Sequence, residues 1–183
     1  MRVIAGTAKG RRLRAAGGTR PTADFVKEAL FSSLGPRIPG ARVADLWAGS
    51  GSLGIEALSR GAASVTFVER DPRALAAIRH NLATTGFAER ARVVEGTVER
   101  FLASAGGDGF DVVLADPPYA DDPQEVLRML GSTAVVGPEG ILALEVASAA
   151  LPPDAAAAGA PALAVRAVKR YGDSAIVYAE RGA

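Results

Sequence analysis

The tetrapeptide Asp116-Pro117-Pro118-Tyr119 brings together the groups needed to hold a planar base that carries an amine. It directly follows the apolar run Phe110–Ala115, which is typical of a buried parallel strand. Two consecutive prolines cannot continue a strand ladder, so the chain leaves the sheet at the carboxyl end, where open α/β sheets place ligands. The Asp116 carboxylate and the Pro117 carbonyl can accept hydrogen bonds from NH2, and Tyr119 can stack on the ring. These residues predict a site that alkylates a base amine.

A second pattern, upstream, predicts a nucleotide-like ligand. An expected strand at residues 42–47 is followed by Gly49–Gly54, which has the form G-x-G-x-x-G, and by an expected helix through Ser59. Glycines in such a loop let the backbone approach a ligand. Glu69 follows the next expected strand, Ser64–Val68, at a spacing where an acid can accept both hydroxyls of a ribose.

Dinucleotides and S-adenosylmethionine are both bound by such a strand, loop and helix, and Asp45 indicates which of the two is the ligand here. A dinucleotide carries a pyrophosphate, which a carboxylate four residues before Gly49 would repel. S-adenosylmethionine carries an ammonium and a sulfonium, which the same carboxylate would attract. The sequence therefore favours S-adenosylmethionine as cofactor, with S-adenosylhomocysteine as product.

The rest of the chain alternates strand-like and helix-like segments, which predicts a mostly parallel sheet with helices on both faces. Asp71-Pro72 is a typical helix start and Gly86 a typical stop, whereas Thr22 is expected to cap an earlier helix. His80, the single histidine, lies off the apolar stripe of its helix, so we expect it to be exposed and non-catalytic. Further strands are expected at residues 91–94, 110–115 and 140–146, with a closing hairpin over 165–179 and a short hairpin over residues 2–15.

Composition fits one compact catalytic domain. The 183 residues are 49% hydrophobic, enough for one sizeable core but not for a separate target-recognition domain. The absence of cysteine excludes disulfides and cysteine-based metal sites, and we expect no metal. We see no apolar leader and no run of membrane-spanning length. We therefore expect a cytoplasmic monomer with no membrane contact and no obligate protein partner.

Positive charge is concentrated in the first 20 residues. They hold six basic residues and no acid, whereas the other 163 residues carry 15 basic and 20 acidic groups, a net of −5. A basic arm on an acidic body is an electrostatic handle for phosphates, although a merely solvated terminus is the alternative. The residues expected to contact nucleic acid are Lys9, Arg11, Arg12, Arg14 and Arg20.

These motifs together resemble one known family. The set Asp45-x-x-Ala48-Gly49-Ser50-Gly51, Glu69 and Asp116–Tyr119 resembles the motifs of amino-methylating class I methyltransferases. The N-terminal half is similar to bacterial 16S ribosomal RNA guanine-N2 methyltransferases of the RsmD type. The residues that carry this likeness are Arg2–Gly6, Gly10–Leu13, and Arg20-Pro21-Thr22 leading into Glu28–Phe31. The resemblance covers essentially the whole chain.

The resemblance implies a Rossmann-like α/β fold with strand order 3-2-1-4-5-7-6 and an antiparallel seventh strand. It also implies an RNA-docking arm at residues 1–20 and a methyltransferase domain at 21–183. Thr97 stands where the family tends to place a longer polar side chain near the adenine amine. The cofactor-binding residues implied are Thr22, Asp45, Ala48, Gly49, Ser50, Gly51, Glu69 and Thr97.

The implied activity is methyl transfer to the exocyclic N2 of a specific guanine in 16S rRNA, in the assembled small subunit. Asp116 and Pro117 would accept the amine hydrogens and Tyr119 would stack the base. One alternative is an adenine-N6 or cytosine-N4 methyltransferase acting on DNA or RNA, which would share the tetrapeptide. The chain has no insertion that could read a duplex groove, which argues against DNA. Another alternative is a non-catalytic RNA-binding module, against which the intact set of motifs argues.

Overall fold

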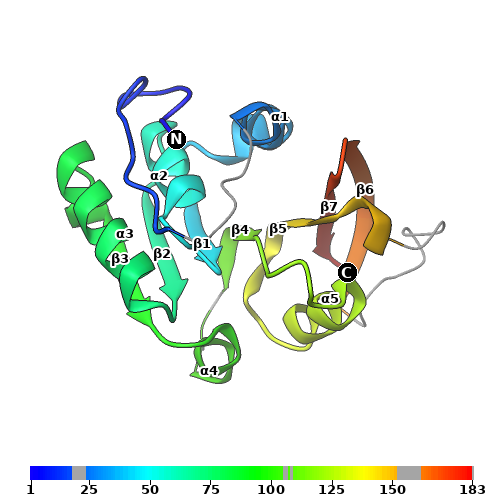
Figure 1. The fold of residues 1–183 in the computed structure, drawn as a ribbon. Coiled ribbons are helices and arrows are strands. Elements are labelled where there is room, and N and C mark those ends of the chain that lie inside the picture. The colour runs from blue at the N-terminus through cyan, green and yellow to red at the C-terminus, as the bar shows by residue number, and fades with distance from the viewer. Residues whose placement is uncertain (18–23, 105–106, 108, 152–161, 183) are drawn as a thin grey trace.

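A single seven-stranded sheet organises the chain, of which the computed structural model describes residues 1–17, 24–104, 107, 109–151 and 162–182 (Figure 1). The strand order is β3-β2-β1-β4-β5-β7-β6, which confirms the expected class I methyltransferase topology. Strands β1 to β5 run parallel to one another, and β7 runs antiparallel between β5 and β6. The strands are β1 (Arg42–Leu46), β2 (Ser64–Glu69), β3 (Ala91–Glu95), β4 (Phe110–Ala115), β5 (Val136–Ala147), β6 (Leu163–Tyr171) and β7 (Ser174–Arg181).

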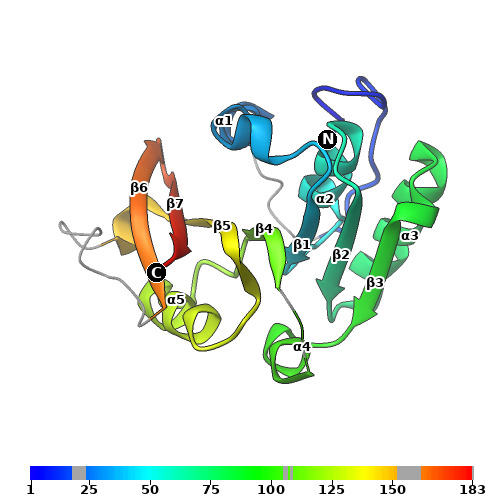
Figure 2. The ribbon, with the colours of Figure 1, turned by 180° about the vertical axis from the view of Figure 1, so that it is seen from behind.

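Helices cover both faces of the sheet, as predicted (Figures 1 and 2). Because successive strand residues point to opposite faces, Leu114 packs into the core under α1, α2 and α3, and Ala115 into the core over α4 and α5. No helix in the described ranges is long and apolar enough to cross a membrane. The helices are α1 (Asp24–Leu34), α2 (Ser52–Ser59), α3 (Pro72–Thr85), α4 (Val98–Ser104) and α5 (Pro123–Gly131), with short 3-10 turns η1 (Gly35–Arg37), η2 (Ala88–Arg90) and η3 (Ser148–Ala150).

The residues expected to start and end a helix do so in the structure. Asp71 accepts a hydrogen bond from the backbone N–H of Arg73 at 2.9 Å, and Gly86 ends α3 in the left-handed conformation, with φ of 78°. His80 is exposed on this helix, which confirms its expected exposure. Asp122-Pro123 repeats the same start signal at α5.

Two strand predictions differ from the structure by more than one or two end residues. Strand β5 begins at Val136 rather than at residue 140. A register shift between the pairs Phe110–Val136 and Val112–Ile141 places Pro138 where β5 has no partner on β4. The expected N-terminal hairpin is reduced to one antiparallel bridge, between Arg2 and Arg12. Much of the remaining backbone of that segment is instead bonded to the helices beneath it.

Candidate active site

A cavity of about 860 Å³ lies at the carboxyl ends of the parallel strands. Its walls include Asp45 of β1, Glu69 of β2, the segment Asp116–Tyr119 after β4, Glu145 of β5 and the turn between β6 and β7. A cavity of this size is in the range that holds small molecules and cofactors. The structure therefore brings the two groups of residues singled out in the sequence into one site.

The loop between β1 and α2 forms the floor of one half of the cavity. Ala48, Gly49 and Ser50 line it, and Gly49 has a φ of 55°, in the left-handed region that favours glycine. Gly51 is not among the lining residues. Its φ is 78°, and an added Cβ would stand 3.2 Å from Phe67 and from Ile78. Gly51 therefore lets α2 start close to the sheet.

Asp45 is a buried carboxylate at the end of β1. Its Oδ2 accepts the backbone N–H of Gly54 at 2.8 Å, which fixes the first turn of α2. Burial raises the pKa of Asp45 well above its usual value, and the hydrogen bond from Gly54 opposes this only in part. The nearby carboxylates of Asp116 and Glu69 raise the pKa further. This end of the cavity therefore favours a cationic ligand.

The carboxylate of Glu69 is held by backbone donors. Its Oε2 accepts the N–H of Gly49 at 2.7 Å, and its Oε1 accepts those of Arg70 and Asp71 at 2.7 and 2.8 Å. A carboxylate offers about four acceptor positions, so three are used within the protein. Glu69 thus lines the cavity in a fixed orientation and retains room for roughly one strong hydrogen bond from a ligand.

Thr97 also lines the cavity, but its hydroxyl forms hydrogen bonds with the first turn of α4. The Thr97 Oγ1 accepts the backbone N–H of Arg100 at 3.3 Å, as an N-cap does. The Thr97 hydroxyl also hydrogen-bonds the Glu99 carboxylate, which lowers the pKa of Glu99. Glu99 itself lines the cavity and was not singled out in the sequence.

The tetrapeptide forms the opposite wall. Asp116 is half-buried, Pro117 is buried, and Tyr119 is 42% exposed, so its ring is open to a stacking partner. The Tyr119 hydroxyl is 2.8 Å from Ser174 Oγ and makes a longer contact of 3.5 Å to Glu145 Oε1. These contacts tie the loop after β4 to strands β5 and β7.

Glu145 and Ser174 were missed in the sequence, although both line the cavity. Glu145 follows the apolar run Ile141–Leu144 within β5, as Asp116 follows the apolar strand β4, and an acid after such a run is a usable signal in the sequence. Ser174 gave no comparable signal, because it reaches the site only through the antiparallel pairing of β7 with β5.

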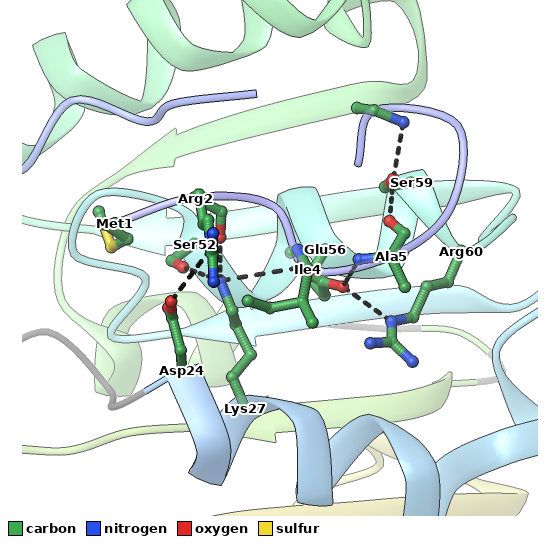
Figure 3. A network of polar contacts seen from close by, with 12 residues as sticks. Met1, Arg2, Ile4, Ala5, Asp24, Lys27, Ser52, Glu56, Ser59 and Arg60 are labelled. Carbon is green, nitrogen blue, oxygen red and sulfur yellow. Dashed lines mark hydrogen bonds and ion pairs between the residues drawn. The ribbon is translucent and has the colours of Figure 1, made fainter. Parts of the chain in front are cut away.

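The N-terminal segment, residues 1–17, is anchored to the domain by a buried carboxylate (Figure 3). Glu56 of α2 accepts the backbone N–H groups of Ile4 and Ala5 at 2.8 and 2.9 Å. It also pairs with Lys27 at 3.7 Å and with Arg60 at 2.8 Å. The side chains of Lys27 and Glu56 are fully buried, and burial lowers the pKa of Lys27 although Glu56 opposes the shift.

Further bonds extend this anchor to the loop between β1 and α2 and to the first residue of α2. The Lys27 ammonium donates to the Arg2 carbonyl at 2.6 Å and to Ser52 Oγ at 3.1 Å. Asn81 accepts the N–H of Arg14 at 2.8 Å, and its amide donates to the carbonyls of Arg14 and Ser50, each at 3.0 Å. The backbone of the segment is therefore part of the fold rather than a solvated tail.

The basic side chains of this segment stay on the surface. Lys9, Arg11, Arg12 and Arg14 are exposed, and none of them lines the cavity. Arg20 and Thr22, expected to contact RNA and cofactor respectively, lie outside the described residues. Across the described ranges, no group of three or more His, Cys, Asp or Glu could hold a metal ion.

Comparisons of the sequence with known proteins all indicate the same family. The family described as Conserved hypothetical protein 95 matches residues 1–180. YlbH of Bacillus subtilis strain 168, named as a candidate rRNA methyltransferase, is 46% identical over 134 residues, covering 71% of this chain and 73% of its own. Ribosomal RNA small subunit methyltransferase D of Escherichia coli K12 is 38% identical over 148 residues, covering 79% and 74%.

A comparison with solved structures indicates the same kind of protein. The structure of YhhF from Escherichia coli, named as a candidate methyltransferase, superposes with a TM-score of 0.84 at 34% identity, covering 100% of this chain and 98% of that one. The family match to residues 1–180 includes the N-terminal segment, the loop between β1 and α2 and the segment after β4. The chain therefore belongs to the Conserved hypothetical protein 95 family, the family of RsmD-type methyltransferases.

Proposed function

We propose that this chain transfers a methyl group from S-adenosylmethionine to the exocyclic N2 of a specific guanine in 16S rRNA. The observation that carries the proposal is one cavity whose walls hold Asp45 and Glu69 on one side and Asp116–Tyr119 on the other. A donor and an acceptor bound in one cavity can be held in line, and proximity alone lowers the barrier by several kcal/mol. The names of the relatives support RNA of the small subunit as substrate.

The residues at the first side suit S-adenosylmethionine. The buried Asp45 favours a cation, the backbone of Ala48–Ser50 is open to close approach, and Glu69 is fixed to accept a ribose hydroxyl. Bound there, the cofactor would supply a methyl group that its sulfonium already activates. The chain itself needs only to bind, orient and keep water away from the reacting atoms.

The residues at the other side suit an aromatic amine. The N2 of guanine is a weak nucleophile, since its lone pair is delocalised into the ring. Hydrogen bonds from N2 to the Asp116 carboxylate and the Pro117 carbonyl would localise this lone pair and stabilise the positive charge that grows on nitrogen. Tyr119 would stack the base, which must leave its RNA stack to enter.

The arm supplies the third part of the proposal. Lys9, Arg11, Arg12 and Arg14 are presented on a backbone that Glu56 and Asn81 hold in place. Such a surface would contact phosphates of the small-subunit RNA without reading its sequence. We propose that the protein acts as a monomer on the assembled small subunit in the cytoplasm, where that substrate occurs.

The direct test is incubation with S-adenosylmethionine and three substrates: undermethylated 30S particles, free 16S rRNA and DNA. Nucleoside analysis then identifies the product. N2-methylguanosine from 30S particles supports the proposal in full. N6-methyladenosine or N4-methylcytidine, from RNA or DNA, would replace it with the alternative amino-methyltransferase activity. Calorimetric binding without any methylated product would indicate a module that only binds.

A further inference from the structure

Glu145 occupies the position on β5 that corresponds to Asp116 beside it. Ala115 of β4 is in register with Leu144 of β5, so Asp116 and Glu145 are the next residues along two adjacent parallel strands. Both line the cavity, and adjacent strands lie about 4.8 Å apart. Side chains that start from two backbones at this spacing can meet neighbouring atoms on one edge of the same base.

The surroundings of Glu145 direct it to this edge. The residue is 7% exposed, and the Tyr119 hydroxyl stands 3.5 Å from Glu145 Oε1. If Tyr119 stacks on the face of the base, a carboxylate at the level of its hydroxyl reaches the rim of the ring rather than its face. Guanine carries N–H donors that a carboxylate at this position can accept.

The Watson–Crick edge of guanine distinguishes it from the other amino-bearing bases. Guanine presents N1–H beside its N2 amine, whereas the ring nitrogen next to the amine of adenine or cytosine carries a lone pair and no hydrogen. A carboxylate can only accept hydrogen bonds, so it fits N1–H and repels a lone pair. An acceptor at this position therefore discriminates against a base whose ring nitrogen has a lone pair there.

We infer that Glu145 is the residue that selects guanine, by accepting N1–H while Asp116 and Pro117 accept the two hydrogens of N2. The inference rests on the proposed function and assigns the base specificity of the same site. It makes Glu145 distinct from Asp116 in role. Asp116 acts on the amine that reacts, and Glu145 acts on a neighbouring atom that does not.

The test uses 2-aminopurine, which keeps the reactive amine but has a lone pair at N1. Small-subunit particles are reconstituted with 16S rRNA that carries either guanine or 2-aminopurine at the methylated position, after that position is mapped. For the unaltered protein we expect kcat/KM to favour guanine by at least about a hundredfold. Glu145→Gln should shrink this preference at least about tenfold, because its amide can donate to the lone pair.

Two further variants keep the result interpretable. Glu145→Asp retains the charge, so it should keep the preference for guanine even if its turnover falls. Asp121→Asn removes an exposed acid from the rim of the same cavity and should leave the preference unchanged. S-adenosylmethionine affinity and the thermal midpoint of each variant establish that the domain is intact.

Each outcome decides the inference. If Glu145→Gln lowers kcat/KM for guanine and 2-aminopurine by the same factor, Glu145 is a structural or proton-accepting group and the inference fails while the proposed function stands. If the methylated nucleoside from native particles is not N2-methylguanosine, the proposed function and the inference fail together. A selective loss of the preference, rescued by Glu145→Asp, supports both.

Discussion

The carboxylate of Glu69 accepts the backbone N–H of Gly49 at 2.7 Å, which joins the end of β2 to the loop after β1. The two motifs that the sequence presents 20 residues apart are therefore one structural unit. Glu69 both shapes the loop and faces the cavity that the loop borders. A change at Glu69 should affect cofactor affinity through both roles.

Glu69→Ala should weaken S-adenosylmethionine binding by about 1.5–3 kcal/mol, or roughly 10- to 150-fold in Kd. The weakening arises because a charged acceptor for the ribose disappears and the N–H of Gly49 loses its partner. Isothermal titration calorimetry measures the change. An unaltered Kd would remove Glu69 from the binding site.

Asp45→Asn should stabilise the ligand-free protein at neutral pH and weaken its cofactor binding. The raised pKa of Asp45 means that the folded state holds this proton more tightly than the unfolded state does. Stability is therefore lost as pH rises from the ordinary aspartate pKa toward the raised one, and asparagine removes that loss.

Thermal unfolding over a pH series checks this prediction for both proteins. As pH rises from the ordinary aspartate pKa toward the raised pKa of Asp45, the thermal midpoint of Asp45→Asn should increase relative to that of the native chain. A difference in stability that stays constant with pH would show that Asp45 does not titrate abnormally.

Asp116→Ala should abolish most turnover and leave cofactor affinity nearly intact. Its acceptor role toward the amine is realised only with the base in place, so the effect should appear in kcat, as a fall of about a hundredfold or more. Calorimetry and single-turnover methylation of 30S particles separate the two effects. A parallel fall in cofactor affinity would instead assign Asp116 to the cofactor half of the cavity.

The parts of the site that the sequence predicts are those carried by local patterns. Asp116 and Glu69 each follow a recognisable apolar strand, and Asp71-Pro72 starts a helix by its own side chain and ring. The strand order came from family resemblance, because periodicity specifies strands but not their neighbours. The other parts of the site depend on which distant strands pair with one another, and local patterns do not show this. Ser174 enters the site only because β7 inserts between β5 and β6.

The anchoring of the arm could not be predicted for the same reason. Glu56 lies within a helix whose sequence gives no sign that its carboxylate bonds Ile4 and Ala5, about 50 residues earlier in the chain. The basic residues were visible from composition, whereas their fixed backbone depends on long-range contacts. The charge pattern thus predicted the surface but not its rigidity.

The buried pair of Lys27 and Glu56 should respond asymmetrically to substitution. Glu56→Gln removes the charged acceptor that Lys27, Arg60 and the two backbone N–H groups share, so it should lower the free energy of unfolding by about 3–5 kcal/mol. Lys27→Met should cost clearly less, because Glu56 keeps its other three donors. Urea unfolding measures the free energy of unfolding of both variants. An equal loss of stability in Glu56→Gln and Lys27→Met would contradict a central role for Glu56.

Replacing Arg11, Arg12 and Arg14 together by alanine should weaken RNA binding without altering the domain. Their side chains are exposed, and the bonds between Arg14 and α3 are made by its backbone. Thermal stability and S-adenosylmethionine affinity should therefore stay close to those of the native chain. Affinity for the ribosomal substrate should fall, and its dependence on salt should flatten by about 0.7–0.9 in log-log slope for each phosphate that the protein no longer neutralises.

A matched control uses three exposed arginines on other elements of the domain, Arg92 of β3, Arg100 of α4 and Arg128 of α5. Replacing these three by alanine changes net charge by the same amount, so any general electrostatic effect is the same. Substrate affinity measured by filter binding from low to physiological salt should fall steeply only for the arm variant. If both triple variants shift affinity and salt slope alike, net charge alone attracts the RNA. The fixed backbone held by Glu56 and Asn81 would then serve the fold and not the substrate.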